Sequence, residues 1–194
     1  NERPISARTS RAVDMASQAG AVITLATGRM FQSALAATAD LNITSPIVSY
    51  QGAHIADAIT GKVLWHRPLT PEMSLAALDA LSTWEREVLA YHAGQVYVNM
   101  RTPWVEAYAE RNQRRVHVVP DLNSLAAKGP TRLVAVGDED GIHELYLHLK
   151  ATLDSLLHVT RSLPYFCEIL HPEAGKHRAL AWLCDHLGIR QNET

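Results

Sequence analysis

The sequence contains little of what would mark a secreted, membrane-bound or nucleic-acid-binding protein. Its two cysteines, Cys167 and Cys184, form no CxxC pair, so neither a disulfide framework nor a thiolate metal site is indicated. We interpret both as small apolar residues in a protein of a reducing, cytoplasmic compartment. The net charge is only −2 and no basic block occurs, which argues against a nucleic-acid partner. No apolar run approaches the roughly 20 residues of a membrane helix, and no signal peptide is recognisable, so we expect no membrane partner.

The composition that is present is that of an ordinary globular protein. Hydrophobic residues make up 47% of the 194 residues and charged residues 20%. A chain of this length can bury a substantial core, in one large domain or two small ones. We expect a monomer or a weak dimer.

Short helical and apolar segments alternate along the first third of the chain. The expected elements are a helix between Ser6 and Gly20, a strand at 21–26, a helix at about 30–40, a strand at 47–50 and a hairpin that turns at Thr60-Gly61. Helix and strand in units this short predict a parallel α/β sheet.

A different pattern begins near residue 68. Helical segments alternate with strands that are joined by short turns, for example 87–93 and 95–100 through Gly94. We interpret residues 68–166 as a compact α/β insert with an antiparallel sheet. A short strand, a loop and a helix that ends at Gly188 follow, and Ala179, Leu183 and Leu187 lie on the apolar side of that helix.

The turn Thr27-Gly28-Arg29 follows the expected strand at 21–26 directly. Open α/β sheets bind ligands at the carboxyl ends of their strands, and the start of the next helix favours an anion. Thr27 can donate a hydrogen bond and Arg29 can hold a phosphate. The same residues also suit a plain strand-to-helix turn, in which Thr27 is only a cap.

Gly175-Lys176 stands at the start of the last helix. A lysine is unfavourable at that end of the helix dipole, which suggests that Lys176 serves an anion. The alternative is a solvated surface lysine. Gln51-Gly52 ends the strand at 47–50 and is either a turn alone or, if this edge is a site, a place where Gln51 touches substrate.

Two motif-like stretches carry no chemistry in our interpretation. His143 and His148 lie five positions apart, about 140° around a helix, and therefore cannot share a metal ion. Asp138 and Glu139 resemble an acidic metal-binding loop, but they more simply start a helix, where acidic groups suit the dipole.

In their order and separation, the "TGR", "QGA" and "GK" turns resemble the Cof-type branch of the haloacid dehalogenase-like phosphatases. The similarity covers both flanks, "ISARTSRAVDMASQAGAVITLATGR" with "PIVSYQGAHIADAITGKVL", and "CEILHPEAGKHRALAWLCDHLGI". It implies a Rossmann-like core with a large α/β cap inserted into it. The domains would be core residues 1–67, cap residues 68–166 and a second core segment, truncated, at 167–194.

The resemblance also implies an activity and roles for individual residues. Members hydrolyse small phosphate esters, such as sugar phosphates, with Mg²⁺ and an aspartyl-phosphate intermediate. Thr27 and Lys176 would be the catalytic residues that hold the phosphoryl group. Gly28, Arg29, Gln51 and Gly52 would bind substrate, although relatives more often have Asn in place of Gln51. His177 replaces a frequent glycine. The expected partner is a small phosphorylated metabolite.

The family's first motif, Asp-x-Asp-Gly-Thr, would precede residue 1, and its fourth, Gly-Asp-x-x-Asn-Asp, would follow residue 194. These motifs supply the nucleophile, the acid/base and the Mg²⁺ ligands. We therefore expect the metal ligands outside this chain and no hydrolysis by these 194 residues alone. Two alternatives stay open, a noncatalytic module that binds phosphate or a partner, and a related phosphomutase. Cap residues Arg101, Trp104 and Tyr108 either face the substrate or serve packing and surface.

Overall fold

A computed structural model of the chain describes residues 5–194, which form two compact units. Among the described residues, unit 1 comprises 5–66 and 175–194, and unit 2 comprises 67–174.

The first helix of unit 1 begins and ends where local signals place it. Helix α1 (Ala7–Gln18) starts at Ser6, whose hydroxyl accepts a hydrogen bond from the Thr9 amide, and ends before Gly20 with φ of 92°. Helix α2 (Phe31–Ala37) is followed by a 3₁₀ turn, η1 (Ala39–Leu41). A second 3₁₀ turn, η3 (Gln191–Glu193), lies near the end of the chain.

The expected strand at 21–26 is wrong as a strand, because only Ala26 forms a bridge, parallel to Val48. Backbone hydrogen bonds link Val48 to Leu25 and Thr27. Before Leu25, the segment is held by a side-chain hydrogen bond instead: the Thr24 hydroxyl donates to the carbonyl of Pro46 at 2.6 Å. Proline has no amide hydrogen to donate, so a regular ladder cannot continue past Pro46.

Three short antiparallel strands form the small sheet of unit 1, in the order β1 (Ile47–Ser49), β2 (His54–Ala56) and β3 (Val63–His66). A 3₁₀ turn, η2 (Tyr50–Gly52), joins β1 to β2. The hairpin expected at Thr60-Gly61 is confirmed, and the Asp57 carboxylate accepts from the Thr60 amide at 2.7 Å.

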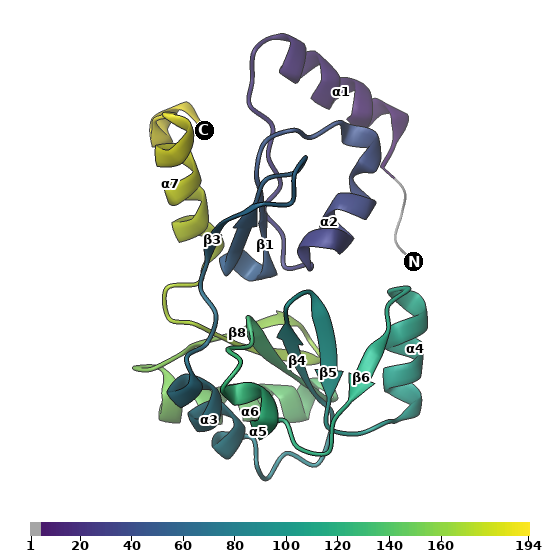
Figure 1. The fold of residues 1–194 in the computed structure, drawn as a ribbon, viewed down its shortest axis with the longest axis vertical. Helices are drawn as coiled ribbons and strands as arrows, with labels where there is room; N and C mark the ends of the chain where they lie inside the picture. Colours follow the sequence, from purple (N-terminus) through teal and green to yellow (C-terminus); the bar gives the residue numbers. More distant parts are fainter. Residues whose placement is uncertain (1–4) are drawn as a thin grey trace. The chain divides into compact units, whose positions relative to one another are not determined.

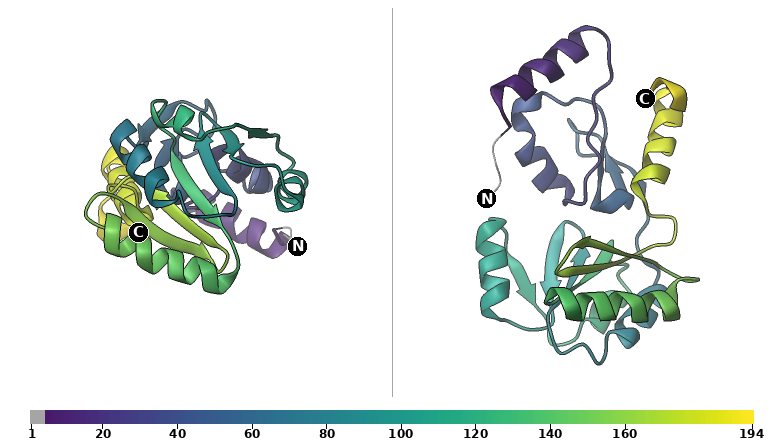
Figure 2. Two further views of the ribbon diagram at one scale, coloured as in Figure 1. Left: turned by 90° about the horizontal axis from the view of Figure 1, so that it is seen from below. Right: turned by 180° about the vertical axis from the view of Figure 1, so that it is seen from behind.

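Helix α7 (Lys176–Leu187) packs on this sheet and ends, as expected, at Gly188 in the left-handed conformation. Its buried residues Ala179 and Leu183 join Val48, Ile55 and Trp65 in one hydrophobic cluster. Within unit 1, α7 lies on one side of the strands and α2 on the other (Figures 1 and 2). This packing fixes the start of α7 next to the end of β1.

Unit 2 contains a six-stranded sheet in the order β6-β5-β4-β7-β9-β8. The strands are β4 (Val88–His92), β5 (Gln95–Val98), β6 (Val116–Val118), β7 (Arg132–Val136), β8 (His158–Leu163) and β9 (Phe166–Leu170). All neighbours are antiparallel except β5 and β6, which helix α4 (Pro103–Arg111) connects. The antiparallel sheet expected in this region is thus present, with one parallel pair at its edge.

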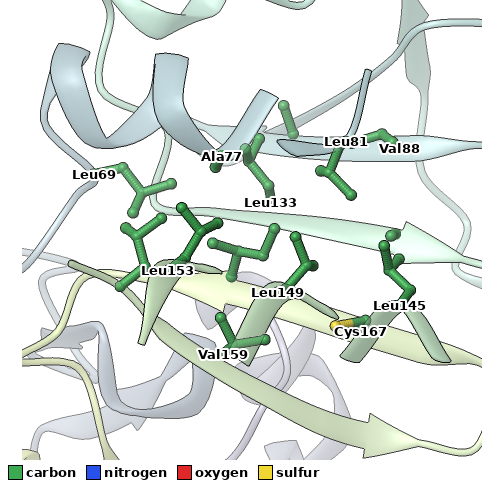
Figure 3. Close-up of a cluster of buried hydrophobic side chains, with 14 of the residues drawn as sticks. Leu69, Ala77, Leu81, Val88, Leu133, Leu145, Leu149, Leu153, Val159 and Cys167 are labelled. Carbon is green, nitrogen blue, oxygen red and sulfur yellow. The ribbon is translucent and has the colours of Figure 1, made fainter. Parts of the chain in front are cut away.

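Helices α3 (Pro71–Ala80), α5 (Asn123–Ala126) and α6 (Glu139–Leu153) gather on one face of this sheet (Figure 1). Figure 3 shows the hydrophobic core beneath them, in which Leu145, Leu149 and Leu153 of α6 lie with Leu133 and Val159 of the strands. The four-residue spacing along α6 places these leucines on one face, which explains the packing.

The strand at 166–170 belongs to unit 2, whereas we expected the second core segment to begin at residue 167. β9 pairs with β7 on one side and β8 on the other, so its backbone is committed to the large sheet. The two units divide at 174/175 instead.

Candidate functional site

The turn at residues 27–29 lies at the end of the extended segment that runs beside β1. The Thr27 amide donates to the Val48 carbonyl at 3.0 Å. Its side-chain oxygen accepts a hydrogen bond from the Arg29 amide at 3.2 Å, as in a turn stabilised by a hydroxyl. A hydroxyl that accepts in this way still has a proton to donate. The cap interpretation and the ligand interpretation of Thr27 are therefore compatible.

The turn η2 carries backbone strain. Tyr50, Gln51 and Gly52 have φ values of 50°, 57° and 93°, three consecutive residues in the left-handed region. Glycine adopts this conformation freely, but each of the other two residues costs roughly 1–2 kcal/mol. Such strain persists only where neighbouring contacts impose it, and it concentrates at functional sites.

Hydrogen bonds tie η2 to the turn at 27–29. The Tyr50 amide donates to the Arg29 carbonyl at 2.9 Å, and the Gln51 amide donates to the Thr27 carbonyl at 3.1 Å. The Gln51 side chain also lies against Gly28, where a Cβ atom would be 2.6 Å from its Nε2. A side chain at residue 28 would therefore displace the end of the Gln51 side chain.

On its other side, η2 touches the start of α7. A Cβ atom on Gly52 would lie 2.3 Å from the carbonyl carbon of Gly175 and 2.6 Å from the backbone nitrogen of Lys176. Lys176 is the first residue of α7 and its side chain is exposed. The N-cap residue is Gly175, so no N-cap side chain covers the first amides of this helix. The His177 ring folds back over Gly175, where its Cε1 would lie 2.9 Å from an added Cβ atom.

The structure therefore brings together the three turns that the sequence singled out. Their backbones adjoin in the order 27–29, 50–52 and 175–176, with η2 in the middle. Thr27, Gly28 and Gln51 are half-buried, Gly52 is buried, and Arg29 and Lys176 are exposed. The roles of these six residues in binding and catalysis remain predictions.

A cluster that the sequence did not reveal lies beneath η2. The His54 Nδ1 is 3.0 Å from the hydroxyl of Ser49, which is fully buried. Burial, aided by the nearby His66, lowers the pKa of His54 from 6.5 to about 4. The only signal in the sequence is the position of His54 two residues after the Gln51-Gly52 turn.

Among residues 5–194, no group of three His, Cys, Asp or Glu side chains is arranged to hold a metal ion. The described residues do not fit a Mg²⁺ site.

Asp138 starts helix α6, as expected, with its carboxylate accepting from the Gly141 amide at 2.9 Å. His143 and His148 are exposed on the same helix.

The cap residues considered from the sequence make contacts of their own within unit 2. Trp104 stacks on Tyr108 at 5.3 Å, and the Tyr108 hydroxyl lies 2.9 Å from that of Tyr91. Arg101 forms an exposed ion pair with Glu106 at 3.0 Å. It also lines a cavity of about 420 Å³ between α4 and β6.

Both cysteines are free and buried, which confirms their interpretation as apolar residues of the interior. Burial raises the pKa of the Cys167 thiol to about 12. In the described part of the chain, no helix combines the length and the hydropathy that crossing a bilayer demands.

The sequence matches a known family along its whole length. A model of the haloacid dehalogenase-like hydrolases matches residues 1–194. The chain belongs to this family. The membership that the three turns indicated is thereby confirmed.

Individual relatives agree with this assignment. An HMP-PP phosphatase of Enterobacter sp. (strain 638) is 28% identical over 174 residues, which cover 86% of this chain and 61% of that protein. This chain thus spans less than two thirds of that relative's length. A solved structure from Thermotoga maritima superimposes with a TM-score of 0.82 at 22% identity, covering 98% of this chain and 71% of that one. A HAD/COF-like hydrolase of Plasmodium vivax gives a TM-score of 0.82 at 16% identity, covering 95% and 68%. The α/β fold expected from the sequence, that of the Cof-type members, is confirmed.

Proposed function

We propose that the turns at 27–29, 50–52 and 175–176 hold the phosphoryl group of a small phosphate monoester, in an enzyme that hydrolyses it. The observation that carries this proposal is the contact of Gly52 with Gly175 and Lys176. It joins the lysine at the start of α7 to the same turn that is hydrogen-bonded to Thr27 and Arg29.

Each of these groups has a chemical task in the proposal. The Thr27 hydroxyl donates a hydrogen bond to a phosphoryl oxygen. Lys176 provides a compact positive charge that neutralises the anion, helped by the amides at the start of α7. Gly52 lets the turn at 50–52 approach the backbone at the start of α7 closely, and Gly28 leaves room for the Gln51 side chain. Preorganised donors of this kind stabilise the charge that develops during phosphoryl transfer.

The family resemblance assigns the nucleophilic aspartate, the acid/base and the Mg²⁺ ligands to motifs outside these 194 residues. When bound, Mg²⁺ would neutralise charge on the phosphoryl oxygens. The residues of this chain bind and orient the phosphoryl group, and we derive no further step from them.

We propose a small phosphorylated metabolite as the substrate, a sugar phosphate or a compound of similar size. The Enterobacter relative is described as an HMP-PP phosphatase, so that compound belongs among those tested. We further propose that the protein acts in the cytoplasm.

The test compares the gene product that includes the coding sequence on both sides of this chain with its T27A and K176A variants. A panel of phosphate esters, HMP-PP included, is assayed with Mg²⁺ present. We expect each substitution to lower kcat/KM by about a hundredfold or more. R178A is the matched control, because Arg178 is also an exposed cation in the first turn of α7.

Other outcomes would contradict the proposal in distinct ways. If K176A were as active as R178A, Lys176 would have no role in holding the phosphoryl group. Phosphate binding without turnover of any ester, even by the extended product, would favour a noncatalytic module. Transfer of the phosphoryl group between positions of a sugar, with no release of phosphate, would identify a phosphomutase.

A further inference from the structure

The base of the η2 turn is closed by a pair of side chains. Ser49 and His54 face each other across β1 and β2 as the last paired residues before the turn. The Ser49 hydroxyl lies 3.0 Å from His54 Nδ1 and 3.3 Å from the His54 carbonyl, to which it donates. This contact therefore links the two ends of the segment that contains the three left-handed residues.

The His54 ring also supports the strained residue itself. Its centroid lies 5.7 Å from that of Tyr50, which is 4% exposed, and 5.8 Å from that of Phe31 at the start of α2. The contact with Tyr50 is edge-on and the contact with Phe31 is tilted, and aromatic rings at these centroid distances attract each other. Because Phe31 follows the turn at 27–29 closely in sequence, one imidazole contacts elements beside both turns.

The charge state of this ring is set by the groups around it. The His66 ring is its direct cross-strand neighbour on β3, with centroids 5.4 Å apart. Tyr50 in η2 carries a titratable phenol, whereas Ser49 on β1 and Phe31 on α2 carry no charge. Burial and His66 together keep the pKa of His54 at about 4. A proton on His54 would be poorly solvated and would face a second histidine.

We propose that His54 is a positioning residue of the candidate site: its neutral ring, held by Ser49 and packed on Tyr50, keeps the η2 turn in its left-handed form. A second proton on the ring, which leaves the Ser49 contact intact, places a poorly solvated charge beside His66, and this charge releases the turn. The consequence for anion binding rests on the proposed function. The clamp on the turn does not. Through this effect of His54 on the η2 turn, acid would weaken anion binding although His54 itself does not touch the anion.

Three amides report on the turn directly. Those of Tyr50, Gln51 and Ala53 donate to the carbonyls of Arg29, Thr27 and Tyr50. Their hydrogen exchange is measured by NMR in the 194-residue chain between pH 3.5 and 7.5 and corrected for the intrinsic pH dependence. The His54 ring is followed in the same samples. We expect protection of the three amides to fall about tenfold with the midpoint of the His54 titration, while Leu183 in α7 stays protected.

Two variants separate the clamp from general acid sensitivity. H54Q keeps a neutral hydrogen-bonding side chain. The turn amides of this variant should therefore stay protected from exchange, and their protection should no longer depend on pH. S49A removes the hydroxyl and keeps the ring, so it should raise exchange of the same amides about tenfold at pH 7. Unchanged exchange in S49A, or an acid transition of the turn that persists in H54Q, would overturn the proposal.

Sulfate binding is the second readout, because sulfate keeps its double charge throughout this pH range. We expect its affinity to fall about tenfold from pH 6 to pH 4 in the unaltered chain and to change less in H54Q. If the unaltered chain binds no sulfate at any pH, the anion site proposed above fails, while the exchange data still decide the role of His54.

Discussion

Gly52 lies so close to Gly175 that a single added carbon atom on Gly52 would sit 2.3 Å from the Gly175 carbonyl carbon. The two residues are more than a hundred positions apart in the sequence, yet neither backbone leaves room for a side chain on Gly52. This contact determines where the start of α7 lies relative to the turn at 50–52. The candidate site depends on it.

Substitution of Gly52 by alanine should therefore be severe. The new methyl group would meet backbone atoms at 2.3–2.6 Å and would also force a left-handed alanine. We expect the free energy of unfolding to fall by about 3 kcal/mol and anion binding to be lost. Denaturant unfolding measures the first effect. G61A is the matched control, because Gly61 has φ of 70° with open space around it and should lose only about 1 kcal/mol. Equal losses in the two variants would contradict the close approach.

The lowered pKa of His54 should make the free energy of unfolding depend on pH. Its pKa is about 4 in the folded chain and 6.5 when unperturbed, so the unfolded chain binds more protons between these values. The free energy of unfolding should therefore fall as the pH drops from 6.5 to 4, and this contribution should not grow further below pH 4. We expect about 2 kcal/mol, because water reaches part of the ring. Urea titrations at several pH values should show this component in the unaltered chain and not in H54Q. If the free energy of unfolding changed with pH in the same way in both proteins, His54 would not be the cause.

The buried ion pair in unit 2 should be costly to break. Arg132 and Glu168 lie 2.6 Å apart on neighbouring strands, with side chains 8% and 3% exposed. The Arg132 guanidinium also lies 4.3 Å from the centre of the Tyr91 ring. E168Q would leave the arginine charge buried without its counter-ion, and we expect a loss of about 3–5 kcal/mol.

The exposed pair Lys150–Asp154 provides the comparison for E168Q. It joins Lys150 in the last turn of α6 to Asp154, the C-cap residue of that helix, and D154N should cost less than about 1 kcal/mol. Both variants are measured by chemical unfolding at pH 7. A cost of E168Q as small as that of D154N would show that the Arg132–Glu168 pair is not effectively buried.

Asp138 should behave as a helix cap. Its carboxylate accepts from the Gly141 amide and pairs with Arg86 at 2.5 Å. The hydrogen bond to the Gly141 amide, with the charge of Arg86, lowers the pKa of this carboxyl. In chemical unfolding, D138A should lower the free energy of unfolding, and D138N should lower it by less, since asparagine also caps helices well. If D138N were as damaging as D138A, the contribution would come from charge rather than from capping. Neither substitution should alter the hydrolysis proposed above.

Local signals predicted much of the secondary structure correctly. Ser6 and Asp138 accept hydrogen bonds from amides in the first turns of their helices, and Gly188 ends α7. These features depend on residues within a few positions of one another, so a single sequence contains all the information needed. The same holds for the hairpin at Thr60-Gly61. The three motif turns are also local features, because each is a short stretch with unusual residues.

What the sequence by itself determined is therefore the set of turns and caps, together with the family to which their order points. Only the tertiary structure decided that Pro46 leaves residues 21–26 as a single bridge, that β9 joins the large sheet, and that Ser49 and His54 close the strained turn. Each of these depends on which backbone groups and side chains meet across the fold. Pairing between distant segments is set by packing and by the availability of amide donors, and neither is encoded in any short stretch of residues.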